Sequence, residues 1–95
     1  MDKKQAYEKK FNAKLDELNA KIDVLKANAK QAQASAEADY YQAIEDLKKK
    51  RSEAQDNLQK LREASDDAWE DMKQGVEESW TSFSSAVESA FSRFQ

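Results

Sequence analysis

The sequence predicts an all-α protein, built as a long amphipathic helix or a helical hairpin that forms an oligomeric coiled coil. Three observations support this prediction. The 95 residues include no Pro and one Gly, which nearly excludes a turn-rich β fold. Ala, Lys, Glu, Gln and Leu dominate the chain, and all of them are good helix formers. Large apolar residues recur in steps of three or four from Tyr7 to Phe94, which is the spacing of one helix face.

The apolar stripe continues along the whole chain. Its mean step is about 3.6 residues, the repeat of the α-helix, so the stripe stays on one face. Residues 11–36 and 44–68 each follow heptads, the pattern of coiled coils. We therefore expect residues 1–64 to form a heptad-patterned coiled-coil helix. Its expected oligomer interface consists of Phe11, Leu15, Leu18, Ile22, Leu25, Ile44, Leu47, Leu58 and Leu61.

Residues 65–95 form the second expected unit, an aromatic amphipathic helix. Apolar residues return there every eleven residues, a period that favours straight or right-handed packing. The face expected to meet a partner or lipid contains Trp69, Met72, Val76, Trp80, Phe83, Val87, Phe91 and Phe94. The opposite face is rich in Ser. An aromatic core packed against another helix is the preferred interpretation, and a helix that senses lipid packing is the alternative.

Two segments are candidates for a break in the helix. Residues 27–36 carry no large apolar side chain; a closely packed Ala seam is the preferred interpretation, and a flexible turn is the alternative. Residues 63–67 include Ser65 and Asp66, which are good N-cap residues, and Asp67 with Glu70 has the spacing of a capping box. The stripe crosses this second segment in phase, so the pattern fits both a helix boundary and a continuous helix.

Charge is distributed in blocks, although the net charge is only −3. Residues 48–62 sum to +4 and residues 63–79 to −6, which favours antiparallel pairing or a folded-back hairpin. The basic run at 48–51 lacks interleaved aromatic residues and is flanked by acids, so no nucleic-acid partner is expected. Arg51 lies on the apolar stripe. It either specifies the helix register or extends its charge to solvent along its aliphatic stem.

The segment LREASDDAWEDMKQGVEESW resembles a family of small cyanobacterial and proteobacterial coiled-coil proteins described as stress-response proteins. The clearest match is the run DAWED at 67–71, followed by Gly75, Val76 and Trp80. The resemblance extends over most of the chain. It implies a bacterial coiled coil linked to stress response, with no catalytic residues. Relatives often carry Gly near the positions of Ser65 or Asp66, which this sequence lacks.

The composition points away from an enzyme. Without Cys or His, the chain has no disulfide, no thiolate or imidazole metal ligand and few nucleophile–base pairs. Its paired carboxylates lie off the stripe and are expected to be solvated, so they lack the burial that separates catalytic pKa values. A weak divalent-cation site is a minor alternative at Asp66, Asp67, Glu70 and Asp71. We expect no catalytic residue, no metal, no cofactor and no small-molecule substrate.

The expected partner is a second copy of the chain, paired antiparallel, and a membrane surface is the alternative. No apolar run approaches the length of a membrane span, and the first ten residues lack the apolar segment of a secretory signal. The cytoplasm is therefore the expected location, with peripheral attachment to a membrane as the variant that the aromatic helix suggests.

Overall fold

The computed structural model describes residues 3–94, which form three α-helices and one short 3-10 helix. The helices are α1 (Lys3–Gln31), α2 (Ala34–Glu63), η1 (Trp69–Met72) and α3 (Lys73–Phe94). The all-α prediction is confirmed, since no strand occurs in this part of the chain. Residues 1, 2 and 95 of the two expected units lie outside the described residues.

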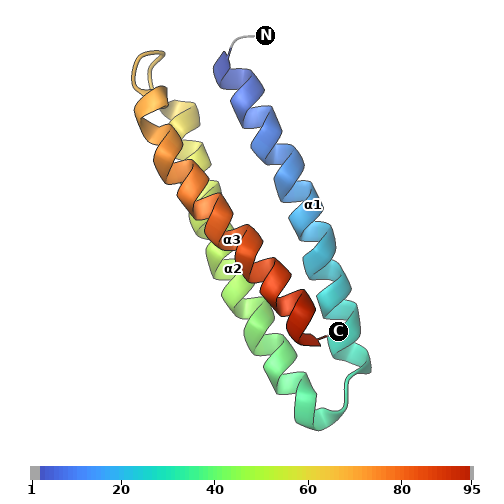
Figure 1. Ribbon diagram of the computed structural model, residues 1–95. Helices are drawn as coiled ribbons and strands as arrows, with labels where there is room; N and C mark the ends of the chain where they lie inside the picture. Colours follow the sequence, from blue (N-terminus) through green and yellow to red (C-terminus); the bar gives the residue numbers. More distant parts are fainter. Residues whose placement is uncertain (1–2, 95) are drawn as a thin grey trace.

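The helices form a three-helix bundle in which each runs antiparallel to the one before it (Figure 1). α3 returns along α2 and also contacts α1. The bundle measures 52 × 20 × 18 Å, whereas a single helix of this length would span roughly 140 Å. The folded-back alternative is therefore the correct one. Three helices share the core, rather than the two of a hairpin.

The first reversal of the chain lies at residues 32 and 33, within the stretch where a continuous Ala seam was preferred. That expectation is wrong, because α1 ends at Gln31 and α2 begins at Ala34. Gln33 adopts an extended conformation, with φ −64° and ψ 151°, and its carbonyl accepts the first helical bonds of α2. This stretch has no large apolar side chain to bury, so a turn here loses little of the free energy of core packing. The expected unit 1–64 is accordingly two helices.

The second reversal lies at residues 64–68, the segment where the sequence fitted either a boundary or a continuous helix. α2 ends at Glu63, and Ala64 is extended, with ψ 154°. The Ser65 carbonyl accepts hydrogen bonds from the amides of Ala68 and Trp69, and Ser65 Oγ accepts from Ala68 N at 3.3 Å. Ser65 therefore caps the new turn in the manner of an N-cap residue, whose side-chain oxygen accepts a hydrogen bond from the amide three residues later. Lys4 Nζ donates to the Ala64 carbonyl at 2.7 Å and ties α1 to this turn.

The core consists of the apolar residues of the stripe, which face inward on all three helices. Its most deeply buried large side chains are Phe83, Ile22, Leu25, Leu47, Leu61, Val76 and Val87. No charged or polar residue is buried among residues 3–94. A large aliphatic or aromatic side chain contributes about 1.5–3 kcal/mol on full burial, so the inward-facing stripe supplies the main driving force for this fold.

Candidate functional site

The nine residues expected to form an oligomer interface lie inside one chain. Eight are buried in the core of the bundle, and Leu15 is half-buried against it. These side chains therefore obtain their packing partners from the other two helices. The stripe that motivated self-association does not require a second copy.

The expected partner or lipid face of the C-terminal unit is also largely occupied. Trp69, Val76, Trp80, Phe83 and Val87 are buried. Phe91 and Phe94 are half-buried against the core, and Met72 is the one member that is exposed, at 37%. The structure thus brings most of both predicted sets together in a single core.

The aromatic residues concentrate where η1 and the start of α3 meet α1. The ring centroids of Tyr7 and Phe11 are 4.9 Å apart, and those of Tyr7 and Trp69 are 5.8 Å apart. Trp80 lies 5.4 Å from Phe11 and 6.0 Å from Phe83. Tilted aromatic contacts at these distances add to the free energy of simple burial. They fix the start of α3 onto α1.

Tyr7 adds polar contacts to this cluster. Its hydroxyl lies 3.1 Å from Glu77 Oε1 and 3.3 Å from the Lys73 carbonyl, both on α3. Burial raises the pKa of Tyr7 well above its usual value, and the hydrogen bond to the Glu77 carboxylate and its charge raise it further. The neutral phenol is therefore the form that the fold favours. Lys73 Nζ lies over the Trp69 ring, 4.5 Å from its centroid.

The end of α3 is held by a single aromatic pair. The rings of Tyr40 and Phe94 stack with centroids 4.0 Å apart, and the Tyr40 hydroxyl donates to the Phe94 carbonyl at 3.0 Å. This contact fixes the last turn of α3 onto the first turns of α2.

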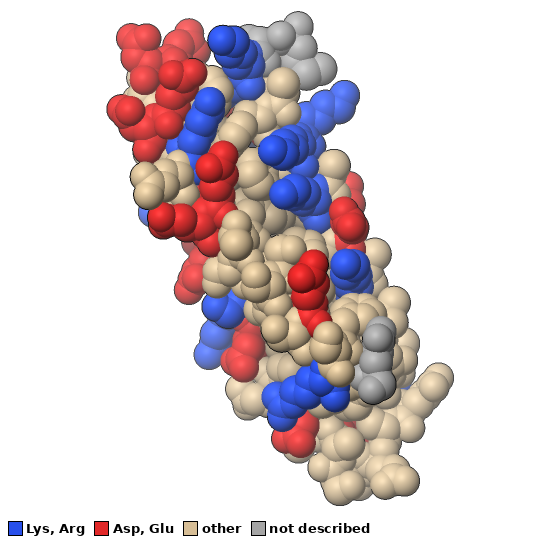
Figure 2. Space-filling view, in the orientation of Figure 1, with Lys and Arg blue, Asp and Glu red and all other residues tan. Residues whose placement is uncertain are grey.

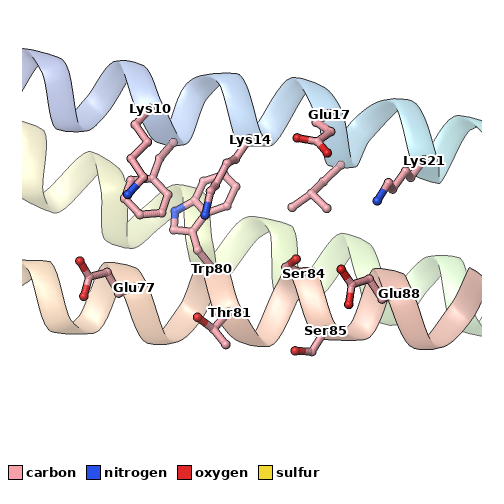
Figure 3. Close-up of a pocket in the computed structure, with 12 residues that line it drawn as sticks. Lys10, Lys14, Glu17, Lys21, Glu77, Trp80, Thr81, Ser84, Ser85 and Glu88 are labelled. Carbon is pink, nitrogen blue, oxygen red and sulfur yellow. The ribbon is translucent and has the colours of Figure 1, made fainter.

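A groove with a volume of about 490 Å³ separates α1 from α3 (Figure 3). The apolar side chains of Phe11, Leu18 and Trp80 line it. The α1 wall carries Lys10, Lys14, Glu17 and Lys21, and the α3 wall carries Glu77, Thr81, Ser84, Ser85 and Glu88. Figure 3 shows the Lys10 and Lys14 side chains extending from α1 toward the Trp80 indole. The groove thus joins apolar and charged side chains in one hollow.

Trp80 has the most unusual environment in this groove. Its side chain is 2% exposed, and its indole nitrogen, Nε1, has no hydrogen-bond partner. No other buried side-chain nitrogen or oxygen between residues 3 and 94 lacks a partner. The indole N–H can only donate, so this position calls for an acceptor. The groove is therefore the best candidate for a binding site.

Other candidate chemistries have weaker support. Asp66, Asp67, Glu70 and Asp71, the minor candidate for a cation site, are all exposed on the turn and on η1. Within residues 3–94, no group of three or more acidic side chains is arranged to hold a metal ion. The groove carries the only arrangement that combines burial, charge and an unsatisfied polar atom in the described chain.

Sequence reasoning found the apolar part of this groove and missed its charged wall. Phe11, Leu18 and Trp80 all belong to the predicted stripe. Lys10, Lys14 and Lys21 were not singled out, although they flank the stripe at spacings of four and seven residues, which place them on one side of a helix. That spacing was the available signal. Its meaning depends on which helix lies opposite, which the spacing does not specify.

None of the helices between residues 3 and 94 combines the length and the apolar character that crossing a bilayer requires. No protein-family model matches the chain, and no curated protein or solved structure matches it. The resemblance to bacterial coiled-coil stress-response proteins therefore stays a prediction.

Proposed function

We propose that this protein is a non-enzymatic interaction protein that associates with a second copy of itself. Because the apolar stripe is used within one chain, association has to involve the polar surface. The observation that supports the proposal is a separation of charge at the end of the bundle where α2 meets η1. Exposed acids gather on the turn and η1, at Glu63, Asp66, Asp67, Glu70 and Asp71. Exposed lysines occupy the adjacent half of α1, at Lys3, Lys9, Lys10 and Lys14.

Figure 2 places this acidic group over the turn between α2 and α3, and the lysines along α1 beside it. Few of these charges are paired within the chain. The ion pairs between described residues are Lys48 with Glu45 at 3.4 Å and Lys73 with Glu70 at 4.0 Å. A two-fold axis at this end would set the basic side of each copy against the acidic side of the other, as a closed dimer interface requires. Electrostatic complementarity of this kind also selects the partner.

The exposure of the carboxylates supports the non-enzymatic part of the proposal. No carboxylate is buried in the described chain, and burial is what separates the pKa values of a catalytic acid and base. A stress-related role enters only through the resemblance, since no contact in the bundle bears on it. The cytoplasm remains the expected location.

Two charge-reversal variants test the self-association. In Lys3→Glu/Lys9→Glu the exposed lysines of α1 become acidic, and in Asp66→Lys/Asp67→Lys the turn becomes basic. By light scattering at low salt we expect the wild type to dimerise and each variant alone to remain monomeric. An equimolar mixture of the two variants should dimerise again, because the reversed charges then match. Salt should weaken both dimers, since the charges are exposed.

The matched control is Lys30→Glu/Lys49→Glu, which makes the same charge change at exposed positions away from this end. It should dimerise as the wild type does, apart from a small general effect of net charge. A wild type that stays monomeric at high concentration and low salt contradicts the proposal. So does a mixture of variants that fails to associate.

Association with a lipid surface through α3 is the second candidate. One observation favours it: the irregular segment 64–68 joins α3 to α2 and can serve as a hinge. Trp80 and Phe83 are 2% and 0% exposed, so α3 would have to leave α1 before its aromatic face could enter lipid. Small, highly curved vesicles present packing defects and should then shift Trp emission, whereas large vesicles of the same composition should not. Equal emission with both vesicle sizes eliminates this candidate.

A further inference from the structure

The groove between α1 and α3 has the features of a small-molecule site. Its volume of about 490 Å³ falls within the range of about 300–1,000 Å³ typical of ligand pockets. Its apolar lining runs from Phe11 to Leu18 along α1 and includes Trp80 from α3. The eleven helical steps from Lys10 to Lys21 correspond to about 16 Å, which is about the length of an extended twelve-carbon chain. The groove is thus long, narrow and partly apolar.

Donors collect near one end of this groove. Lys10 Nζ lies 5.6 Å and Lys14 Nζ 5.4 Å from the centroid of the Phe11 ring, and the Trp80 ring packs on the same phenyl group at 5.4 Å. Neither lysine forms an ion pair with a described residue. The buried Trp80 Nε1 also lacks an acceptor. Two ammonium groups and one unsatisfied indole N–H therefore lie around the Phe11 ring, and each of them can donate to an anionic oxygen.

The charges of the remaining lining residues restrict the anion. The groove is also lined by three glutamates, Glu17, Glu77 and Glu88, so it contains as many acidic as basic side chains. A dianion such as a phosphate monoester would meet these carboxylates at close range. A carboxylate carries one negative charge and two acceptor oxygens, so it can accept from Trp80 while it pairs with a lysine.

We propose that the α1–α3 groove binds a long-chain carboxylate. Its head group lies between Lys10 and Lys14, and accepts a hydrogen bond from Trp80 Nε1 once the side chains that cover this buried nitrogen move aside. Its alkyl chain extends past Leu18 toward Lys21, where Thr81, Ser84 and Ser85 form the rim. The molecule is bound and not converted, since the groove contains no catalytic pair. The site shares Lys10 and Lys14 with the basic side of the proposed dimer interface, but the charge-reversal variants that test the dimer change Lys3, Lys9, Asp66 and Asp67, none of which lines the groove.

Calorimetry and the indole resonances test this site on the full chain. The probe is sodium dodecanoate, kept below its micelle concentration. We expect one saturable site, and a downfield shift of the Trp80 indole N–H resonance as it gains an acceptor. Trp69 provides an internal control, because it lines none of this groove; Trp69→Phe assigns the two resonances. Dodecyltrimethylammonium, which has the same chain and a cationic head, should bind at least about tenfold more weakly.

Three variants locate the head group. Lys10→Gln/Lys14→Gln removes both charges at exposed positions and should weaken dodecanoate binding by about tenfold without a change in helicity. Lys30→Gln/Lys49→Gln makes the same change outside the groove and should leave binding unchanged. Trp80→Phe keeps a ring but removes the N–H, and should also weaken binding if the fold is retained.

The proposal is overturned if no saturable binding of dodecanoate is found, or if the cationic amphiphile binds equally well. An equal loss of affinity in both lysine variants overturns it too, because binding would then follow net charge alone. An unshifted Trp80 resonance at saturation would remove the indole from the site. The proposed function is decided separately, because light scattering on the wild type and on the variants at Lys3, Lys9, Asp66 and Asp67 uses no dodecanoate and changes no residue of the groove.

Discussion

Arg51 on α2 donates a hydrogen bond from Nη1 to Oδ1 of Asn19 on α1, over 2.9 Å. Both residues are half-buried, and Arg51 lies on the apolar stripe. The arginine is therefore held by a specific partner on the neighbouring helix. Of the two interpretations left open for Arg51, this geometry favours the one in which it specifies the helix register, because a shift of α2 along α1 would break the bond.

A double-mutant cycle should detect this contact. We expect Arg51→Ala and Asn19→Ala each to destabilise the bundle, and the pair to couple by about 0.5–1.5 kcal/mol, the usual net value of a hydrogen bond. Urea denaturation of the four proteins measures the coupling. As a control, Lys49→Ala combined with Asn19→Ala should show additive effects, since Lys49 is exposed and makes no recorded contact with Asn19. Additive effects in both cycles would show that Arg51 does not specify the helix register through Asn19.

The boundary at Ser65 predicts an unusual tolerance of glycine. Ser65 lies in the turn and caps it, and a cap position accepts Gly at a cost of a few tenths of a kcal/mol. Ser65→Gly should therefore leave the free energy of unfolding nearly unchanged. Ser52→Gly, at an exposed position inside α2, should cost about 0.5 kcal/mol or more because Gly loses backbone entropy in a helix. Equal costs for both variants would indicate a continuous helix at 65.

The turn at Ser65 is easier to predict from the sequence than the turn at Gln33. Ser65, Asp66 and Asp67 are capping residues, and they occur where a boundary was considered. Around Gln33 every neighbour is Ala, Gln or Ser, and no Gly or Pro marks a reversal. Ala32 and the extended Gln33 make that turn, and its cause is tertiary: folding back buries the stripe of α1 against that of α2.

The core residues were predictable, whereas their partners were not. Leu18, Ile22 and Phe83 are inward-facing in the bundle because the period of the stripe requires one apolar face per helix. The same face is buried equally well by a helix of the same chain or of a second copy, so periodicity leaves the choice open. The groove depends on that choice, because Lys14 and Trp80 come together only when α3 folds back onto α1.

The hydroxyl of Tyr7 predicts a stability difference that depends on pH. Its pKa in the folded protein is raised by burial and by Glu77, whereas the unfolded chain ionises near the ordinary value of about 10. Below pH 10 both states hold the proton, and the stabilisation is fully present. Above pH 10 the unfolded state loses its proton first, so stability falls as the pH rises.

Tyr7→Phe is the matched variant, since it keeps the ring contacts with Phe11 and Trp69 and removes the ionisable group. We expect the wild type to be more stable at neutral pH and this advantage to shrink above pH 10. Denaturation of both proteins at several pH values measures the difference, and titrations common to both cancel. An advantage that stays constant up to the most alkaline pH would contradict the assignment.

The packing of Phe83 predicts a large loss from a single truncation. This side chain is 0% exposed among α1, α2 and α3, and Phe→Ala in a core typically costs about 3–5 kcal/mol. Phe83→Ala should therefore unfold most of the bundle or greatly lower its denaturation midpoint. Tyr41→Ala removes an aromatic ring that is 44% exposed, and should change stability by less than about 0.5 kcal/mol. Comparable losses in the two variants would place Phe83 outside the core.

The burial of the apolar stripe within one chain is the claim on which the groove and the choice of interface both depend. Its most direct test is the midpoint of urea denaturation over about a hundredfold range of protein concentration, in high salt so that exposed charges are screened. If α1, α2 and α3 of one chain make the core, the midpoint stays constant and the helicity is unchanged on dilution. A midpoint that rises with concentration would show that the stripe is completed by a second copy, and would contradict the three-helix bundle.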